Sequence, residues 1–266
     1  MAKIHRTAIV DPRAQLADDV EIGPNCNIAG DVVIGASTRL IGNVWLAGPL
    51  KIGENNILYP NVCLGFEPQY RNFTEGAGSG VSIGDHNIFR EGATIHRAIG
   101  EHPTTVGNNN MLMCNAHLGH DCIVGNNCTL ANGALLGGHV TLFDNVTLGG
   151  NAGVHQFCRL GRFAMLSGGV GVSQDIPPFC TVYNMRTVGS LNIVGLRRAG
   201  YRNHLPHLKR AFEILYQSRH TILNALQHIE SELRGDPLCL ELVDFIRNTK
   251  RGITHFKSSE EFAESL

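Results

Sequence analysis

Four histidines, one aspartate and one glutamine lie in a short part of the chain, and they are the side chains best suited to catalysis. They occur in the segments 115–122 (NAHLGHDC), 137–140 (GGHV) and 154–157 (VHQF). An imidazole has a pKa of about 6.5, so it can remove a hydroxyl proton at neutral pH. A neighbouring carboxylate can orient the ring and stabilise its charged form. We therefore predict general-base catalysis by an imidazole of this group, with Asp121 as its partner.

The elements that must position these residues follow from a repeat of six residues. Aliphatic residues recur at every sixth position from Ile4 to Leu64, and again from Val106 to Val172. Most repeats carry a small residue four places after the aliphatic one, and on a strand both point to the same side. Such a chain coils as a three-sided prism with about eighteen residues per turn. We predict a mainly β fold, a left-handed parallel β-helix of hexapeptide repeats, over residues 1–190.

This turn length brings the polar residues together on the outside of the coil. His120, Gly138 and Gln156 share one repeat position and should stack about 4.8 Å apart, the spacing of neighbouring strands. Asp121 and His139 form the adjacent column. Gly138 could offer its backbone N–H to a developing oxyanion, because it has no side chain in the way.

Two excursions interrupt the coil, near residues 65–82 and 96–105, and loops that leave a regular coil on one side commonly line a site. The coil should end near residues 175–178 (DIPP), because two prolines cannot continue a ladder of hydrogen bonds. Three apolar stripes at helical spacing follow. We predict a small helical C-terminal domain over residues 191–266, with residues 258–266 exposed to solvent.

Composition restricts the possible classes of protein. The net charge of −1 argues against general binding of nucleic acid. The first repeat begins almost at Met1 and no long apolar run occurs, so we expect a cytoplasmic protein without stable membrane insertion. Four of the eight cysteines occupy the small inward position, where they act as reduced, small apolar residues. They are Cys26, Cys122, Cys128 and Cys158.

Two other interpretations of the histidines stay open. A zinc site like that of the β-helical carbonic anhydrases requires three imidazoles around an open position. His117 and His120 lack the His-x4-His spacing used by the β-helical carbonic anhydrases, so we expect no metal and no other cofactor. A non-catalytic scaffold is the second interpretation, but a scaffold has no need for aligned histidines.

Several strings of residues resemble the UDP-N-acetylglucosamine O-acyltransferases, which catalyse the first step of lipid A biosynthesis. They are Asn115-Ala116-His117, His120-Asp121-Cys122, Gly138-His139-Val140, Val154-His155-Gln156-Phe157-Cys158, Gln174-Asp175-Ile176-Pro177-Pro178 and Asn192-Ile193. The similarity covers nearly the whole chain. It implies transfer of a 3-hydroxyacyl chain from acyl carrier protein to the 3-hydroxyl of UDP-N-acetylglucosamine, by a homotrimer with its sites between adjacent coils.

The resemblance also implies roles for individual residues. His120 would be the catalytic base, and the Gly138 N–H would bind the oxyanion. Gly168 would set the length of the acyl chain, and a glycine there favours a long one. The implied substrate contacts are Gln69, His117, His139, His155, Gln156, Asn192 and Arg198.

Four positions depart from the family pattern around the acceptor. Tyr70 and Asn72 replace an aspartate and a lysine, while Val194 and Ala199 replace a glutamate and an arginine. The catalytic column is intact, so these changes concern the acceptor more than the reaction. The alternative is therefore an acyltransferase of the same fold that uses another acceptor, such as a 3-amino UDP-sugar.

Overall fold

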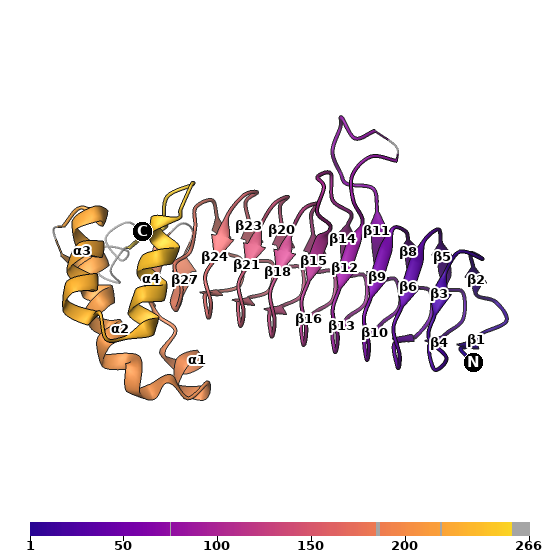
Figure 1. The fold of residues 1–266 in the computed structure, drawn as a ribbon, viewed down its shortest axis with the longest axis horizontal. Helices are drawn as coiled ribbons and strands as arrows, with labels where there is room; N and C mark the ends of the chain where they lie inside the picture. Colours follow the sequence, from indigo (N-terminus) through magenta and orange to yellow (C-terminus); the bar gives the residue numbers. More distant parts are fainter. Residues whose placement is uncertain (75, 185–186, 219, 257–266) are drawn as a thin grey trace.

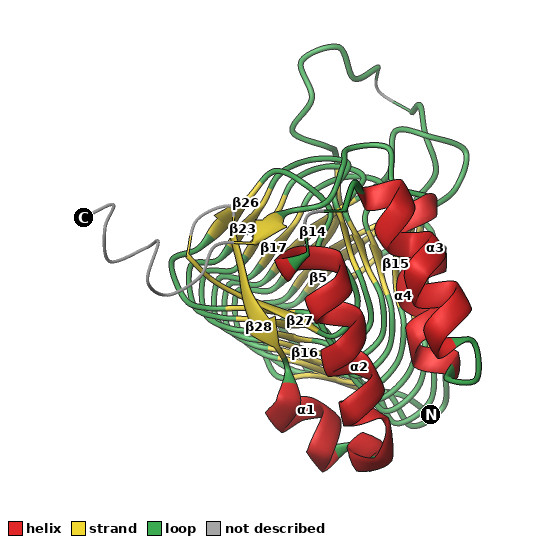
Figure 2. Cartoon of the chain, turned by 90° about the vertical axis from the view of Figure 1, so that its left-hand side faces the viewer, coloured by secondary structure: helices red, strands yellow, loops and turns green. Residues whose placement is uncertain are grey.

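The computed structural model describes residues 1–74, 76–184, 187–218 and 220–256. The chain coils so that its very short strands form three long sheets, which are the three sides of a prism (Figures 1 and 2). Each turn adds one strand to each sheet, so that Ile4 pairs in parallel with Ile22 and Leu118 with Leu136. The predicted left-handed parallel β-helix is confirmed.

The strands of the three sheets, in order of pairing, are as follows. The first sheet contains β1 (Lys3–Ile4), β4 (Glu21–Ile22), β7 (Arg39–Leu40), β10 (Ile57–Leu58), β13 (Ile88–Phe89), β16 (Met111–Leu112), β19 (Thr129–Leu130), β22 (Thr147–Leu148), β25 (Met165–Leu166), β27 (Cys180–Asn184), β28 (Thr187–Leu191) and β29 (His255–Phe256). The second contains β2 (Ile9–Val10), β5 (Asn27–Ala29), β8 (Trp45–Ala47), β11 (Cys63–Phe66), β14 (Thr94–His96), β17 (His117–Leu118), β20 (Leu135–Leu136), β23 (Gly153–Val154) and β26 (Gly171–Val172). The third contains β24 (Arg159–Leu160), β21 (Thr141–Leu142), β18 (Ile123–Val124), β15 (Thr104–Val106), β12 (Val81–Ile83), β9 (Leu50–Ile52), β6 (Val32–Ile34) and β3 (Gln15–Leu16).

The core consists of the inward positions of the repeat. Aliphatic residues such as Leu112, Leu118 and Leu130 are fully buried. The inward cysteines are buried as expected, and desolvation raises the pKa of the Cys122 thiol to about 12. The thiol therefore stays neutral at physiological pH and packs as a small apolar group.

Both predicted excursions leave the coil on the same side. The first lies between β11 and β12, and the second lies between β14 and β15. Figure 1 shows the first as a tall loop that rises above the regular turns of the coil. Both loops leave from the corner between the second and third sheets, which also carries His120 and His139. The loops therefore form part of the surroundings of these histidines.

The C-terminal part differs in detail from the sequence expectation. After the two prolines the chain pairs again: β27 continues the first sheet from β25, and β28 folds back antiparallel to it. In the described residues of this part, four α-helices follow instead of three, with two short irregular helical turns between them. They are α1 (Ile193–Arg198), η1 (Tyr201–His204), α2 (Leu205–Phe212), η2 (Glu213–Gln217), α3 (Ile222–Leu233) and α4 (Pro237–Arg247).

The helices are anchored to the last turns of the coil. Arg162, at the corner before β25, donates to the Glu241 carboxylate of α4 at 2.6 Å, and Arg159 donates to the Phe245 carbonyl at 2.9 Å. The predicted boundary after residue 190 falls at the end of β28. No helix in the described part of the chain is long and apolar enough to cross a membrane. Residues 258–266 lie outside the described residues.

Candidate active site

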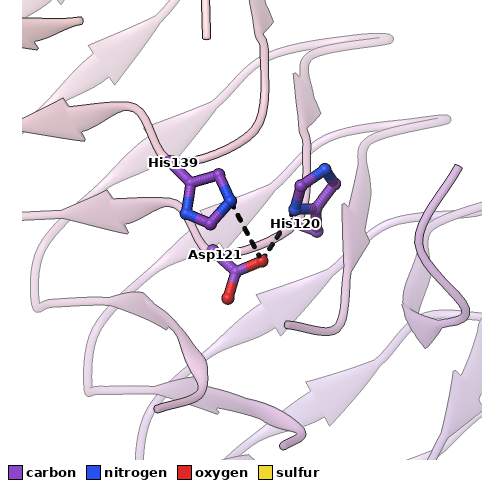
Figure 3. Close-up of side chains that lie close together, drawn as sticks. All are labelled: His120, Asp121 and His139. Carbon is purple, nitrogen blue, oxygen red and sulfur yellow. Dashed lines mark hydrogen bonds and ion pairs between the residues drawn. The ribbon is translucent and has the colours of Figure 1, made fainter. Parts of the chain in front are cut away.

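His120 and Asp121 lie at the corner that follows β17, where the chain turns from the second sheet toward the third. The His120 Nδ1 and the Asp121 Oδ2 are 2.7 Å apart (Figure 3). The two side chains are only 16% and 10% exposed. The structure therefore brings together the imidazole and carboxylate that the sequence suggested as a base and its partner.

The excursion between β14 and β15 holds the Asp121 carboxylate in its ionised form. The backbone amides of Ile99 and Gly100 donate to its two oxygens at 3.0 and 2.9 Å. Burial by itself would raise the pKa of Asp121, but these two hydrogen bonds and the one from His120 outweigh it and lower the pKa. An ionised carboxylate only accepts, so the His120 Nδ1 carries a proton, and in the neutral ring the lone pair is on Nε2.

Gly138 provides the surface on which the His120 ring lies. A Cβ atom built at Gly138 would be 2.6 Å from both Cε1 and Nε2 of His120, which is closer than any side chain could approach. Among the described residues, the Gly138 N–H has no hydrogen-bond acceptor. The amide is thus free to donate to an oxyanion formed beside the ring.

His139 and Phe157 extend the corner over the next two turns of the coil. The His139 Nε2 is 3.8 Å from the Asp121 Oδ2, and its ring meets the His120 ring edge-on with the centroids 5.1 Å apart. Phe157 stacks on His139 at 4.6 Å. Sequence reasoning did not assign Phe157 a role. Its position one turn after His139 was a usable signal, because the corner residues Asp121, His139 and Phe157 all have φ between 59° and 66°.

A cavity of about 680 Å³ is lined by three of the predicted substrate contacts: Gln69, His117 and His155. The His117 Nδ1 is 2.8 Å from the Thr94 Oγ1. Burial, and then the neighbouring His96, lower the pKa of His117, so its imidazole is neutral near pH 7. The remaining lining is a mostly apolar stretch of the second sheet: Leu135, Leu136, Gly137, Gly153, Val154, Gly171, Val172 and Ser173.

Five of the predicted substrate-contact and acyl-length residues do not line this cavity in the single chain. His139 lies at the His120 corner instead. Gln156 is exposed next to the cavity, and Gly168 is exposed at a corner of the coil. The side chain of Asn192 caps α1 by accepting from the Gly195 N–H at 2.9 Å, and Arg198 ends the same helix. Their roles as substrate contacts and as the acyl-length position stay predictions.

One of the departures from the family pattern lies directly at the site. The first excursion places the Tyr70 ring 6.1 Å from the His120 ring, between centroids. The base of that loop is held by Arg97, which is almost fully buried and pairs with the Glu67 carboxylate at 2.7 Å. Tyr70 is therefore held near His120 by an anchored loop.

A parallel β-helix of hexapeptide repeats with an imidazole–carboxylate pair at one corner defines the class of hexapeptide transferases. The family model for bacterial transferase hexapeptide (six repeats) matches residues 1–36 and 103–138. A second model, described as domain 2 of UDP-N-acetylglucosamine O-acyltransferase, matches residues 175–254.

Similar proteins narrow this class to one family. Proteins named acyl-[acyl-carrier-protein]–UDP-N-acetylglucosamine O-acyltransferase from Myxococcus xanthus and Halorhodospira halophila are 44% and 42% identical to the chain. The first alignment covers 96% of the chain and 100% of the relative, and the second covers 95% and 99%. The crystal structure of the Francisella novicida UDP-N-acetylglucosamine acyltransferase has a TM-score of 0.92 at 37% identity, and covers 95% of this chain and 94% of that one. The chain belongs to the UDP-N-acetylglucosamine O-acyltransferase family.

Proposed function

We propose that this protein transfers a 3-hydroxyacyl chain from acyl carrier protein to the 3-hydroxyl of UDP-N-acetylglucosamine, the first step of lipid A biosynthesis. The observation that carries the proposal is the His120–Asp121 pair, whose free Nε2 lies against the backbone of Gly138. The names of the similar proteins support the acyl carrier protein as donor and the UDP-sugar as acceptor.

The geometry supports a direct transfer. The His120 Nε2 removes the proton from the sugar hydroxyl as its oxygen attacks the thioester carbonyl. The carbonyl oxygen becomes an oxyanion that accepts from the Gly138 N–H. The C–S bond then breaks, and the departing thiolate of the carrier takes the proton from His120. Asp121 stabilises the imidazolium between the two proton transfers.

The protein is proposed to work as a homotrimer in the cytoplasm. The His120 corner and the cavity lie on the outside of a single coil, so a neighbouring coil would supply the wall that excludes water. Such a neighbour would also bring a second set of residues, including Gln156, Asn192, Arg198 and Gly168, to each site.

Tyr70 lies beside His120, and this supports a second candidate acceptor, a 3-amino UDP-sugar. A phenol ring near the base alters the shape and charge of the acceptor pocket. A 3-amino UDP-sugar demands less of the base than a hydroxyl does. Assays of one acyl carrier protein thioester against both UDP-sugars decide between them: higher kcat/KM with the hydroxyl sugar supports the proposal, and the reverse result supports the alternative.

The direct test of the mechanism is His120→Ala. General acid–base assistance is typically worth 10²–10⁴-fold, so we expect turnover to fall about 100-fold or more while thermal unfolding is unchanged. His86→Asn is a matched control, because His86 is an exposed corner histidine with a φ of 58° that asparagine tolerates. Near-normal turnover in His120→Ala would exclude His120 as the base.

A further inference from the structure

We propose that His120, Asp121 and His139 also form a binding site for a divalent transition-metal ion such as Zn²⁺, and that the bound ion switches off the general base. The metal site is inferred from geometry alone. Only its inhibitory effect depends on the proposed function.

The three side chains offer a compact set of ligands. One ligand atom from each lies within 4.8 Å of the other two, and among the described residues no other group of three or more such side chains comes as close. The Asp121 Oδ2 lies 2.7 Å from the His120 Nδ1 and 3.8 Å from the His139 Nε2. Figure 3 shows both nitrogens directed at this oxygen. Zinc is bound at about 2.0–2.2 Å by such atoms, so small side-chain rotations would place an ion among them.

The chemistry of the ligands suits this class of ion. Two imidazoles and one carboxylate form a ligand set that binds zinc and its neighbours while leaving a position open. The set carries a single negative charge when both rings are neutral, which a divalent cation compensates. His139 is 39% exposed, so an ion can enter from solvent on that side.

The surroundings hold the ligands in place. The Ile99 and Gly100 amides fix both oxygens of Asp121, and the Phe157 ring stacks on His139. Hydrogen bonds from such surrounding groups typically orient ligands and raise metal affinity. Because these contacts already hold the Asp121 and His139 side chains, metal binding costs less side-chain conformational entropy.

Metal binding and base catalysis need opposite tautomers of His120. In the catalytic form Nδ1 keeps its proton and donates a hydrogen bond to Asp121, so the lone pair of the neutral ring is on Nε2. A metal ion at this site takes the lone pair of Nδ1. The ring proton then sits on Nε2, where it blocks acceptance of the substrate proton. The enzyme therefore has no active base while the ion is bound.

Binding is tested without activity by titrating the chelator-treated, full-length protein with Co²⁺, which gives visible ligand-field absorption in an imidazole–carboxylate site. We expect one Co²⁺ per chain, displaced by Zn²⁺. His139→Asn, which keeps the φ of 60° accessible, should weaken binding at least about ten-fold. His86→Asn should bind as the wild type. Absence of saturable binding, or equal binding by a folded His139→Asn variant, would overturn the site.

Inhibition is tested by measuring acyl transfer against free Zn²⁺. We expect reversible loss of activity that EDTA restores, with the residual activity of His139→Asn resistant to the same Zn²⁺ concentration. Activity that rises with Zn²⁺ or disappears with EDTA would overturn inhibition and favour a catalytic metal. If Co²⁺ binds as expected but no sugar is acylated, the proposed function fails while the metal site stands.

Discussion

At the scale of single residues, the bare backbone of Gly138 allows His120 to occupy its place. We predict that Gly138→Ala lowers kcat about 100-fold, the loss expected when a general base is displaced. The reason is that the new Cβ would lie 2.6 Å from the His120 Nε2, so the ring must move away from Asp121 and the substrate. Steady-state kinetics measure the effect. Gly235→Ala is the control, because its Cβ would meet nothing within 4 Å; equal kcat values for the two variants would contradict the prediction.

Gly168 provides a second prediction at this scale. The wild type should prefer acyl chains of roughly twelve to fourteen carbons, because each buried methylene adds about 0.8 kcal/mol. Gly168→Met should shift the preference to shorter chains, since overpacking costs about 1–3 kcal/mol. Gly168 is exposed in the single chain, so the groove would be completed by a neighbouring subunit. A profile of chain lengths measures both outcomes, and a wild-type optimum at about ten carbons or fewer would show that another residue sets the limit.

At the scale of elements, three buried asparagines stabilise one corner of the coil: Asn56, Asn87 and Asn110. The side chain of Asn87 donates to the Asn56 Oδ1 and to the Gly107 carbonyl, both at 3.0 Å, and accepts from the Asn110 N–H at 2.9 Å. Each side chain thus joins successive turns, where an aliphatic residue would leave backbone groups without partners.

We predict that Asn87→Ala lowers the free energy of unfolding by about 2 kcal/mol or more. It removes the partners of the buried Asn110 N–H and of the part-buried Gly107 carbonyl, and each unsatisfied group costs about 1–3 kcal/mol. Denaturant or thermal unfolding followed by circular dichroism measures the change. Asn132→Ala at an exposed corner should have little effect. If Asn87→Ala lowers the free energy of unfolding as little as the control does, water replaces the hydrogen bonds of the Asn87 side chain.

At the scale of the whole molecule, we predict a homotrimer. The second sheet, which carries the cavity, also exposes large apolar side chains: Ile9 is 66%, Trp45 47% and Leu135 49% exposed. Apolar side chains left exposed along one face often mark a contact with another chain. Light scattering at micromolar concentration should give three times the mass of the 28.9 kDa chain. A monomer under those conditions would refute the trimer.

The sequence by itself determined the coil and much of the site. A period of six residues is a local property, so it sets which side chains point inward at every turn. Because the turn length is constant, residues about eighteen positions apart in the sequence are neighbours in space. This is why His120, Asp121, Gly138 and His139 could be placed together before the structure was known, and why the cysteines could be assigned to the core.

The tertiary structure decided what the repeat does not encode. The excursions bring the amides of Ile99 and Gly100 to Asp121, and Tyr70 to His120; these contacts depend on the paths of irregular loops. The sheet also continues after the prolines, because β27 pairs with β25 at the free edge of the coil and β28 folds back on β27. Such contacts join residues whose separation follows no short period, so the repeat alone does not predict them.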